Sequence, residues 1–386
     1  MVKKLQIIFN SILIPLILLS GCRDPFEPDV TMMDLNYLVV EGYIEVESEE
    51  SIIRLSRTVP LRGENSFRPE SGALISLISE NGFTREFVEK EPGTYGLTGT
   101  FDPNLTYKLN ILLNNNQEYE SEPLIPKISP PIQNLGFVKN EEGVNIQVST
   151  QGREDAVYFL WDYEETWLFR PPFPTAFIFN PETGGIDIRR PEQQVGLCWL
   201  ENKVSRIILD NAGRYADYRI NQKDMVFIPN LSEKLMTRYS ILVRQRAVDK
   251  DAFDFWEIMR KNTEDIGGIF SPLPSIIRGN IHAKNSPSSV AIGFVSMGKS
   301  SKERFYINVQ DVRPWNVFIP DYLGCRVEPD TIPPPSYALQ FSGPNFAPTL
   351  QVVNQMGSVI GYRGTQTRCA DCTLRGSNVR PDFWED

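Results

Sequence analysis

The first half of the chain is a series of short apolar segments, and this series constrains the fold more than any other feature. Six segments rich in β-branched residues are separated by spacers that carry Gly, Pro and Asn: residues 37–47, 52–59, 72–80, 83–89, 93–99 and 105–113. Strand-length segments at this spacing, with turn signals between them, are typical of a β-sandwich. The dipeptide Asn81-Gly82 favours a tight hairpin because both residues tolerate a positive φ. We therefore expect a β-sandwich over residues 37–122.

A Pro-rich segment separates this module from the rest of the chain. Residues 123–132 hold four prolines, which stiffen the backbone and mark the expected domain boundary. Residues 133–386 again carry strand signals, interrupted by expected loops at 170–185 and 313–350. One helix is expected near 251–266, where an apolar stripe follows the acidic residues Asp249 and Asp251, which would offset the helix dipole. The predicted fold is mainly β, with a second β-rich domain that contains one prominent helix.

The first 21 residues have the layout of a bacterial export signal. Lys3 and Lys4 precede an interrupted apolar run, which is shorter than the roughly 20 apolar residues that cross a bilayer. The end of this run, Leu-Ser-Gly-Cys22, resembles a lipobox, in which the cysteine becomes the first mature residue and carries acyl groups. We expect a lipoprotein signal peptide at 1–21, lipidation at Cys22 and an acidic, Pro-containing tether over 22–36. The alternative is a single-pass anchor with an incidental cysteine.

The charge of the expected mature chain narrows the possible partners. Removal of Lys3 and Lys4 with the signal peptide changes the formal net charge from −10 to −12, because residues 1–21 contain no acid. Such an acidic chain is poorly suited to nucleic acid, whose phosphates attract Lys and Arg. The sequence also contains no phosphate-binding loop and no dinucleotide-binding fingerprint. We therefore expect no nucleic-acid partner and no cofactor.

Four cysteines remain after Cys22, and an even number in an exported chain favours disulfide bonds. They are Cys198, Cys325, Cys369 and Cys372, and their positions leave all three pairings open. A zinc site is less favoured, because it needs four ligands and the chain has a single histidine, His282. A thioredoxin-type redox pair at residues 369–372 is also disfavoured, because no βαβ pattern surrounds it. No metal site is expected.

Candidate catalytic carboxylates lie on one aromatic segment. Strand alternation would place Asp162 and Glu164 on one face, about 7 Å apart, which is compatible with glycoside hydrolysis. Alternating acids more commonly form a solvated face, and we favour that interpretation. The acids near Asp249 look briefly like a calcium loop, but the mid-loop Gly and distal Glu are missing, which favours a helix N-terminus. His282 lies in a polar segment without a G-x-S-x-G motif, so we expect a loop histidine with no catalytic task.

The same segment and the Pro-rich stretch after it are unusually rich in aromatic residues. Exposed aromatic side chains beside a long loop would suit a contact surface for a partner or a sugar. The alternative, which we favour, is the core of a β-sandwich with a loop packed over it. The aromatic residues concerned are Trp161, Tyr163, Trp167, Phe169, Phe173, Phe177 and Phe179.

Several segments, taken in order along the chain, resemble the family of Bacteroidetes lipoproteins called DUF4249. Each is short, and their order makes the resemblance specific. The segments are LVVEGYI (38–44), RLSR (54–57), PGTY (92–95), YSILVRQ (239–245), the Phe-Trp pair of the expected helix, IFSP (269–272), GNI (279–281), CADC (369–372) with Gly376, and PDFW (381–384).

The resemblance implies an accessory role at the outer membrane. Members of that family are generally outer-membrane lipoproteins, often encoded beside TonB-dependent receptors, and their first module is similar to Ig-like or carboxypeptidase-regulatory-like sandwiches. No family catalytic residue carries over. We therefore expect a lipid-anchored, non-enzymatic protein that works with a TonB-dependent barrel in binding or uptake of a solute, on either the cell-surface or the periplasmic side. The alternatives are a surface glycan hydrolase that uses Asp162 and Glu164, and a purely structural envelope module.

Overall fold

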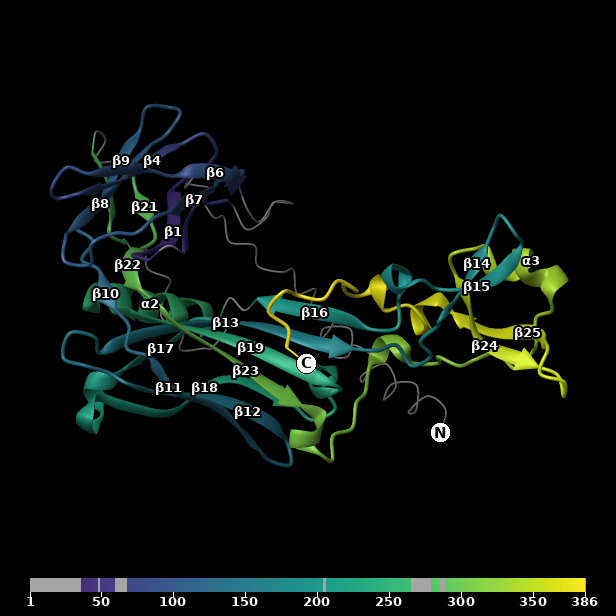
Figure 1. Cartoon of the computed structure of the whole chain (residues 1–386). Coiled ribbons are helices and arrows are strands. Elements are labelled where there is room, and N and C mark those ends of the chain that lie inside the picture. The colour runs from purple at the N-terminus through teal and green to yellow at the C-terminus, as the bar shows by residue number, and fades with distance from the viewer. Residues whose placement is uncertain are drawn as a thin grey trace, which may run out of the picture.

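Most strands in the computed structural model show alternating buried and exposed side chains. The structure describes residues 36–385 apart from residue 48 and segments 60–67, 204–205, 265–278 and 285–288. In Leu74–Ser79, for example, Ile75 and Leu77 are buried whereas Leu74 is exposed, because successive side chains of a strand point to opposite faces. The strands form two β-sandwiches, and a lobe projects from the second one (Figure 1). The chain is mainly β, as predicted.

The first sandwich consists of two sheets around a common core. One sheet has the order β10-β22-β1-β2-β7-β6, with β21 beside β1 and β3 beside β2; the other has the order β20-β9-β8-β4-β5. The Asn81-Gly82 turn joins β4 to β5 as predicted, and Gly82 has a φ of 85°. The strands of this sandwich are β1 (Leu38–Glu45), β2 (Glu50–Arg57), β3 (Arg68–Pro69), β4 (Leu74–Ser79), β5 (Thr84–Glu86), β6 (Val88–Glu91), β7 (Thr94–Thr98), β8 (Tyr107–Leu112), β9 (Glu118–Ser121), β10 (Lys127–Ile128), β20 (Ile281–Ala283), β21 (Ala291–Ile292) and β22 (Val295–Lys299).

A segment from the second half of the sequence completes this first sandwich. β20 pairs with β9 at the edge of one sheet, and β21 and β22 lie parallel to β1 in the other. The approach is close: Gly293 has a φ of 123°, and a Cβ atom there would lie 1.9 Å from the carbonyl oxygen of Val40. The prediction that residues 133–386 belong entirely to a second domain is therefore wrong, because Val295 and Met297 are buried in the core of the first.

The second sandwich packs the sheet β11-β12-β18 against the sheet β16-β13-β19-β23, in which β17 also pairs with β13. The predicted helix is present as α2 (Lys250–Glu264), and the Asp249 carboxylate accepts the backbone N–H of Ala252 at 2.7 Å, so the acids do begin a helix. No helix among the described residues has the length and apolar character needed to cross a membrane. The strands are β11 (Ile132–Lys139), β12 (Gly143–Gln151), β13 (Tyr158–Phe169), β16 (Cys198–Lys203), β17 (Ile208–Asn211), β18 (Arg219–Pro229), β19 (Arg238–Val248) and β23 (Ser301–Asn308).

The Pro-rich segment 123–132 is fixed between the two sandwiches. The Ser129 hydroxyl donates to the backbone carbonyl of Gln245 at 3.1 Å, and the Gln245 amide donates to the carbonyl of Pro130 at 2.8 Å. The same Gln245 side chain accepts the indole N–H of Trp161 at 3.0 Å. Buried hydrogen bonds of this kind are costly to break, because each lost partner leaves a desolvated polar group. The segment is thus a rigid joint rather than a free spacer.

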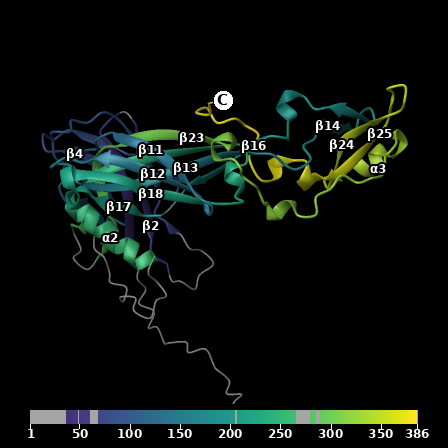
Figure 2. The ribbon, with the colours of Figure 1, turned by 90° about the horizontal axis from the view of Figure 1, so that it is seen from below.

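Two segments predicted as long loops build the projecting lobe together. The first forms the hairpin of β14 (Phe177–Asn180) and β15 (Gly185–Ile188). The second contributes α3 (Tyr337–Phe341) and β24 (Phe346–Val353), which pairs with β25 (Val359–Gln366). Figure 2 shows the lobe at the opposite end of the molecule from the first sandwich. The loop predictions were wrong because apolar side chains of the two segments pack into one shared cluster, which neither segment shows in its own sequence.

Candidate functional site

The aromatic segment considered as an interaction surface lies inside the second sandwich. Four of its side chains share the face of β13 that packs on the opposing sheet, with exposed fractions of 1% for Trp161, 5% for Tyr163, 8% for Trp167 and 0% for Phe169. Phe173 is half-buried at the base of the lobe. The interaction-surface interpretation is therefore wrong for the four residues of β13, and the core interpretation holds, because alternation turns all four toward the same core.

Asp162 and Glu164 lie on the other face of β13, as alternation predicts, and Arg244 of β19 lies between them. An Arg244 nitrogen is 2.7 Å from Oδ1 of Asp162, and another is 4.0 Å from Oε1 of Glu164. The second Asp162 oxygen forms an ion pair with Arg246. Since both oxygens of Asp162 are engaged by cations, this carboxylate is not placed to attack or deprotonate a substrate. The geometry does not support a hydrolase that uses this pair.

The neighbouring acid Glu165 is buried and is hydrogen-bonded to other groups of the protein. Its carboxylate is 1% exposed and accepts hydrogen bonds from Lys234 at 2.7 Å, Tyr239 at 2.8 Å and Asn202 at 2.8 Å. A buried charge is tolerated only when it is paired and hydrogen-bonded in this way. The hydroxyl of Tyr239 has its pKa raised, first by burial and then by the nearby carboxylate. Glu165 thus joins β13 to β16, β19 and the turn at Lys234.

His282 is part of a strand, which corrects the expectation of a loop. It lies in β20 at the edge of the first sandwich, and its Nε2 is 2.8 Å from a carboxylate oxygen of Glu122. Both side chains are more than half exposed. The strand was not recognisable because β20 is three residues long and depends on pairing with β9. Among the described residues, the His282 ring contacts this carboxylate and no hydroxyl group.

The best candidate site is a cleft where the two sandwiches meet. It encloses about 390 Å³. Strands β1 and β2 form one side, whereas β13, β19, β23 and α2 form the other, and Ser296 of β22 also lines the cleft. The lining residues are Glu41, Gly42, Tyr43, Glu45, Glu49, Glu50, Ile52, Arg54, Leu160, Glu164, Arg244, Arg246, Val248, Trp256, Ser296 and Lys302. The cleft therefore combines charged groups of both signs with an apolar wall.

The centre of the cleft is organised around Tyr43. The guanidinium of Arg246 lies over the Tyr43 ring, 4.8 Å from its centroid, in a cation–π contact that joins the two sandwiches. The Tyr43 hydroxyl is buried and has no hydrogen-bond partner among the described residues. Burial raises the pKa of Tyr43 far above its ordinary value, with Glu45 adding to the effect. The phenol therefore stays protonated at neutral pH, so its hydroxyl could donate a hydrogen bond to a ligand but would not act as a base.

Most of the charges in the cleft already have partners, which limits what it can bind. Lys302 forms an ion pair with Glu49, and the Glu45 carboxylate accepts the backbone N–H of Ser300 at 3.1 Å. Glu41 of β1 and Arg54 of β2 face each other across the two strands, and both are exposed. Glu49 and Glu50 are also exposed, but they are paired with Lys302 and Lys90, so Glu41 and Arg54 are the exposed acid and base of the lining that form no ion pair within the described residues. The sequence carried a weak signal for this site: Arg244 and Arg246 are two residues apart on one strand, so their side chains share a face.

A second hollow of similar volume, about 390 Å³, lies beside β17, β18 and α2. Its buried acid, Asp210, accepts hydrogen bonds from Tyr215 at 3.3 Å and Lys223 at 3.2 Å. This carboxylate is therefore satisfied within the protein. In the described part of the chain, no group of three or more His, Cys, Asp or Glu side chains is arranged to hold a metal ion. The cleft between the sandwiches remains the stronger candidate.

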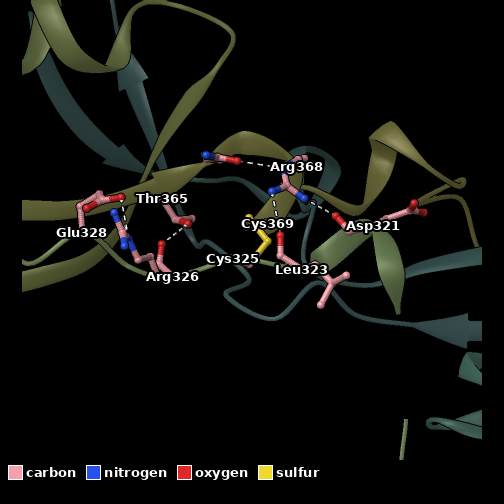
Figure 3. Close-up of a disulfide and its surroundings, with 9 residues drawn as sticks. Asp321, Leu323, Cys325, Arg326, Glu328, Thr365, Arg368 and Cys369 are labelled. Carbon is pink, nitrogen blue, oxygen red and sulfur yellow. Dashed lines mark hydrogen bonds and ion pairs between the residues drawn. A yellow bond between two sulfur atoms is a disulfide. The ribbon is translucent and has the colours of Figure 1, made fainter. Parts of the chain in front are cut away.

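The four cysteines form two disulfides that fix the base of the lobe. Cys198 pairs with Cys372, and Cys325 pairs with Cys369. The two cysteines of the CADC segment thus form disulfides with two different parts of the chain: Cys372 with β16 and Cys369 with the lobe. Figure 3 shows the second disulfide beside Arg368, which donates hydrogen bonds to the carbonyls of Asp321 and Leu323.

The predicted lipidation site, Cys22, lies outside the described residues, as does almost all of the tether at 22–36. The anchor and its consequences therefore stay predictions.

Two solved structures with some similarity to the chain superpose poorly on it. No curated protein matches the chain. A two-domain fibronectin type-III segment of chicken tenascin has 12% identity and a TM-score of 0.14, covering 55% of this chain and 90% of its own. A pullulanase from Anoxybacillus sp., complexed with maltotriose, has 10% identity and a TM-score of 0.15, covering 51% of this chain and 25% of its own. Superposition this poor carries no argument about function.

The family described as "Domain of unknown function (DUF4249)" matches residues 23–304, which is well over half of the chain and includes the whole cleft. The chain belongs to the DUF4249 family.

Proposed function

We propose that this protein is a lipid-anchored accessory protein of the bacterial outer membrane that works with a TonB-dependent transporter and binds a solute without bond-making chemistry. The observation that carries the proposal is the cleft between the two sandwiches. The predicted signal peptide at 1–21, followed directly by Cys22, supports membrane attachment. Attachment to a bilayer would raise the concentration of the protein near a partner in the same membrane.

The composition of the cleft supports a small polar solute as the ligand. Ligand sites typically combine an apolar lining with a few polar groups that fix orientation. Here Ile52, Leu160 and Trp256 supply apolar surface, while the exposed side chains of Glu41 and Arg54 supply an acceptor and a donor. A solute with both a cationic and an anionic or carbonyl group fits this pair.

Membrane attachment and partnership are tested in intact cells. Wild-type protein should incorporate labelled palmitate, and after crosslinking and detergent extraction it should be recovered with an outer-membrane barrel protein. A Cys22→Ser chain is the matched control and should lose both properties. Recovery of the palmitate-labelled lipoprotein without a barrel would contradict the partnership.

Solute binding is tested with the purified protein and a panel of small polar compounds. A true ligand should raise the Tm of the wild type and of an Arg68→Gln variant, whose substitution lies outside the cleft, but should not raise that of Arg54→Gln. A compound that stabilises all three proteins equally binds elsewhere. Turnover of a glycan that is lost in Asp162→Ala would contradict the non-catalytic proposal.

A further inference from the structure

The end of the projecting lobe is built from a stretch without charge. Residues 331–362, which include α3, β24 and the start of β25, contain no Asp, Glu, Lys, Arg or His, although 23% of the residues in the chain are charged. Figure 1 shows these elements at the outermost end of the molecule. A solvated projection normally carries charges, since charged side chains keep exposed segments soluble and apart from other proteins. The absence of charge here requires a reason.

Several large apolar side chains are exposed on this stretch. Met356, at the hairpin turn, is 87% exposed, and Leu339 of α3 is 83% exposed. Val359 and Ile360 are consecutive in β25, so their side chains point to opposite faces, and both are exposed. A hairpin with one solvated face would carry polar residues on that face. The exposed apolar residues of the hairpin, hereafter the β24–β25 tip, are Leu350, Val353, Met356, Val359 and Ile360.

The turn of the β24–β25 tip satisfies its own backbone. The Asn354 side-chain oxygen accepts the N–H groups of Met356 at 3.0 Å and Ser358 at 2.9 Å, and its backbone carbonyl accepts the N–H of Gly357 at 3.0 Å. The Asn354 N–H in turn donates to the carbonyl of Ser358 at 2.9 Å. These bonds pair the N–H groups of Asn354, Met356, Gly357 and Ser358 within the turn, which lowers the cost of removing those groups from water.

The strand edges of the tip are open, which distinguishes a protein partner from a lipid one. Within the described residues, β24 pairs with no strand other than β25. The outer edge of β25 is bridged to Ile332 at Tyr362, which is nearer the base. Unpaired strand edges cannot enter hydrocarbon cheaply, since lipid offers no hydrogen-bond partners. A strand of another protein can supply them by adding to the free edge.

We propose that the β24–β25 tip docks into an apolar, uncharged groove of a partner protein, with the free edge of β24 pairing with a strand of that partner. This inference rests on the proposed function for the identity of the partner, which would be the transporter barrel. Charge complementarity favours an uncharged groove. A charged groove would bury its ionised side chains against the β24–β25 tip, which has no charged side chain to pair with them. Projection of the lobe away from both sandwiches leaves the cleft clear of the docking contact.

Site-specific photocrosslinking in intact cells tests the docking contact. A photoreactive amino acid at Met356 of the full-length chain should link to the same barrel protein that is recovered with the wild type. The matched control is Leu74, which is 69% exposed on the first sandwich and should give no such product. A Met356→Glu variant should recover the barrel at least tenfold less efficiently than the wild type, whereas Leu74→Glu should not change recovery. Both substitutions are at exposed positions, and unchanged circular dichroism verifies the fold.

Three results would overturn the proposal, and they differ from the failure of the proposed function. If the barrel is recovered equally with Met356→Glu, the tip is not the docking element although the partnership stands. If Met356 links only to other copies of this chain, the tip is a self-association surface. If the Cys22→Ser protein floats with phospholipid vesicles and Met356→Glu prevents it, the tip contacts lipid. If the wild type recovers no barrel, both proposals fail together.

Discussion

The base of the lobe provides a test of how far its stability is separate from that of the sandwiches. Cys325 and Cys369 enclose α3, β24 and all of β25, whereas Cys198 and Cys372 connect the body to the C-terminal region. We consider two double variants, in which each pair is replaced by serine. The first variant releases the lobe from its internal link, and the second releases the link between lobe and body.

The expected magnitudes follow from the chain length that each disulfide closes. A sequence separation of 44 corresponds to about 4 kcal/mol of loop-closure entropy, and one of 174 to about 5 kcal/mol, both as upper estimates. The lobe has a small hydrophobic cluster, whose buried members among the described residues are Tyr337, Phe341 and Tyr362. A loss of about 4 kcal/mol is comparable with the stability of so small a unit. The lobe should therefore unfold locally when Cys325 and Cys369 are replaced.

Hydrogen exchange measured by mass spectrometry distinguishes the two outcomes. In the variant of Cys325 and Cys369, peptides from β24 and β25 should lose protection, whereas peptides from β13 and β19 should keep it. In the variant of Cys198 and Cys372, the midpoint of urea unfolding of the body should also fall. Equal loss of protection in lobe and body in the first variant would refute the reasoning, because the lobe would then not be a separate cooperative unit.

Three further predictions concern the joint between the sandwiches and the core. Gln245→Ala should lower the free energy of unfolding by about 2–4 kcal/mol, because two buried partners lose their hydrogen bonds. The control Gln340→Ala, at an exposed position, should change the free energy of unfolding little. Equal urea midpoints for the two variants would contradict this prediction. Gly293→Ala should weaken the attachment of β21 and β22, because the new Cβ would clash with Val40. Gly343→Ala is the control, since nothing lies within 4 Å of a Cβ at that position, and the thermal unfolding temperatures of the two variants should differ. Burial, together with the nearby charge of Glu165, raises the pKa of Tyr163 to about 12 in the folded protein, whereas the pKa is about 10 in the unfolded chain. The stability that the protonated Tyr163 contributes is therefore complete below pH 10 and is lost as the pH rises toward 12. Tyr163→Phe should show a smaller loss of stability over that range in denaturant titrations, and identical pH profiles would contradict the assignment.

Local patterns in the sequence were sufficient for elements whose partners lie nearby. The Asn81-Gly82 turn, the alternation of Asp162 and Glu164, and the start of α2 after Asp249 all follow from φ preferences, strand periodicity and helix capping. Each depends on interactions within a few residues. The cluster of aromatic residues on β13 was ambiguous for the same reason, since alternation tells which side chains share a face but not whether another sheet covers it.

The sequence by itself determined the mainly β character, the principal helix and the family, because these depend on composition, periodicity and ordered short motifs. Only the tertiary structure decided that β20 to β22 return to the first sandwich, that two expected loops make one lobe, and that Cys369 and Cys372 bind different partners. The physical reason is that these contacts join residues far apart in the chain. Their free energy comes from shared burial, for which neither segment alone carries a local signal.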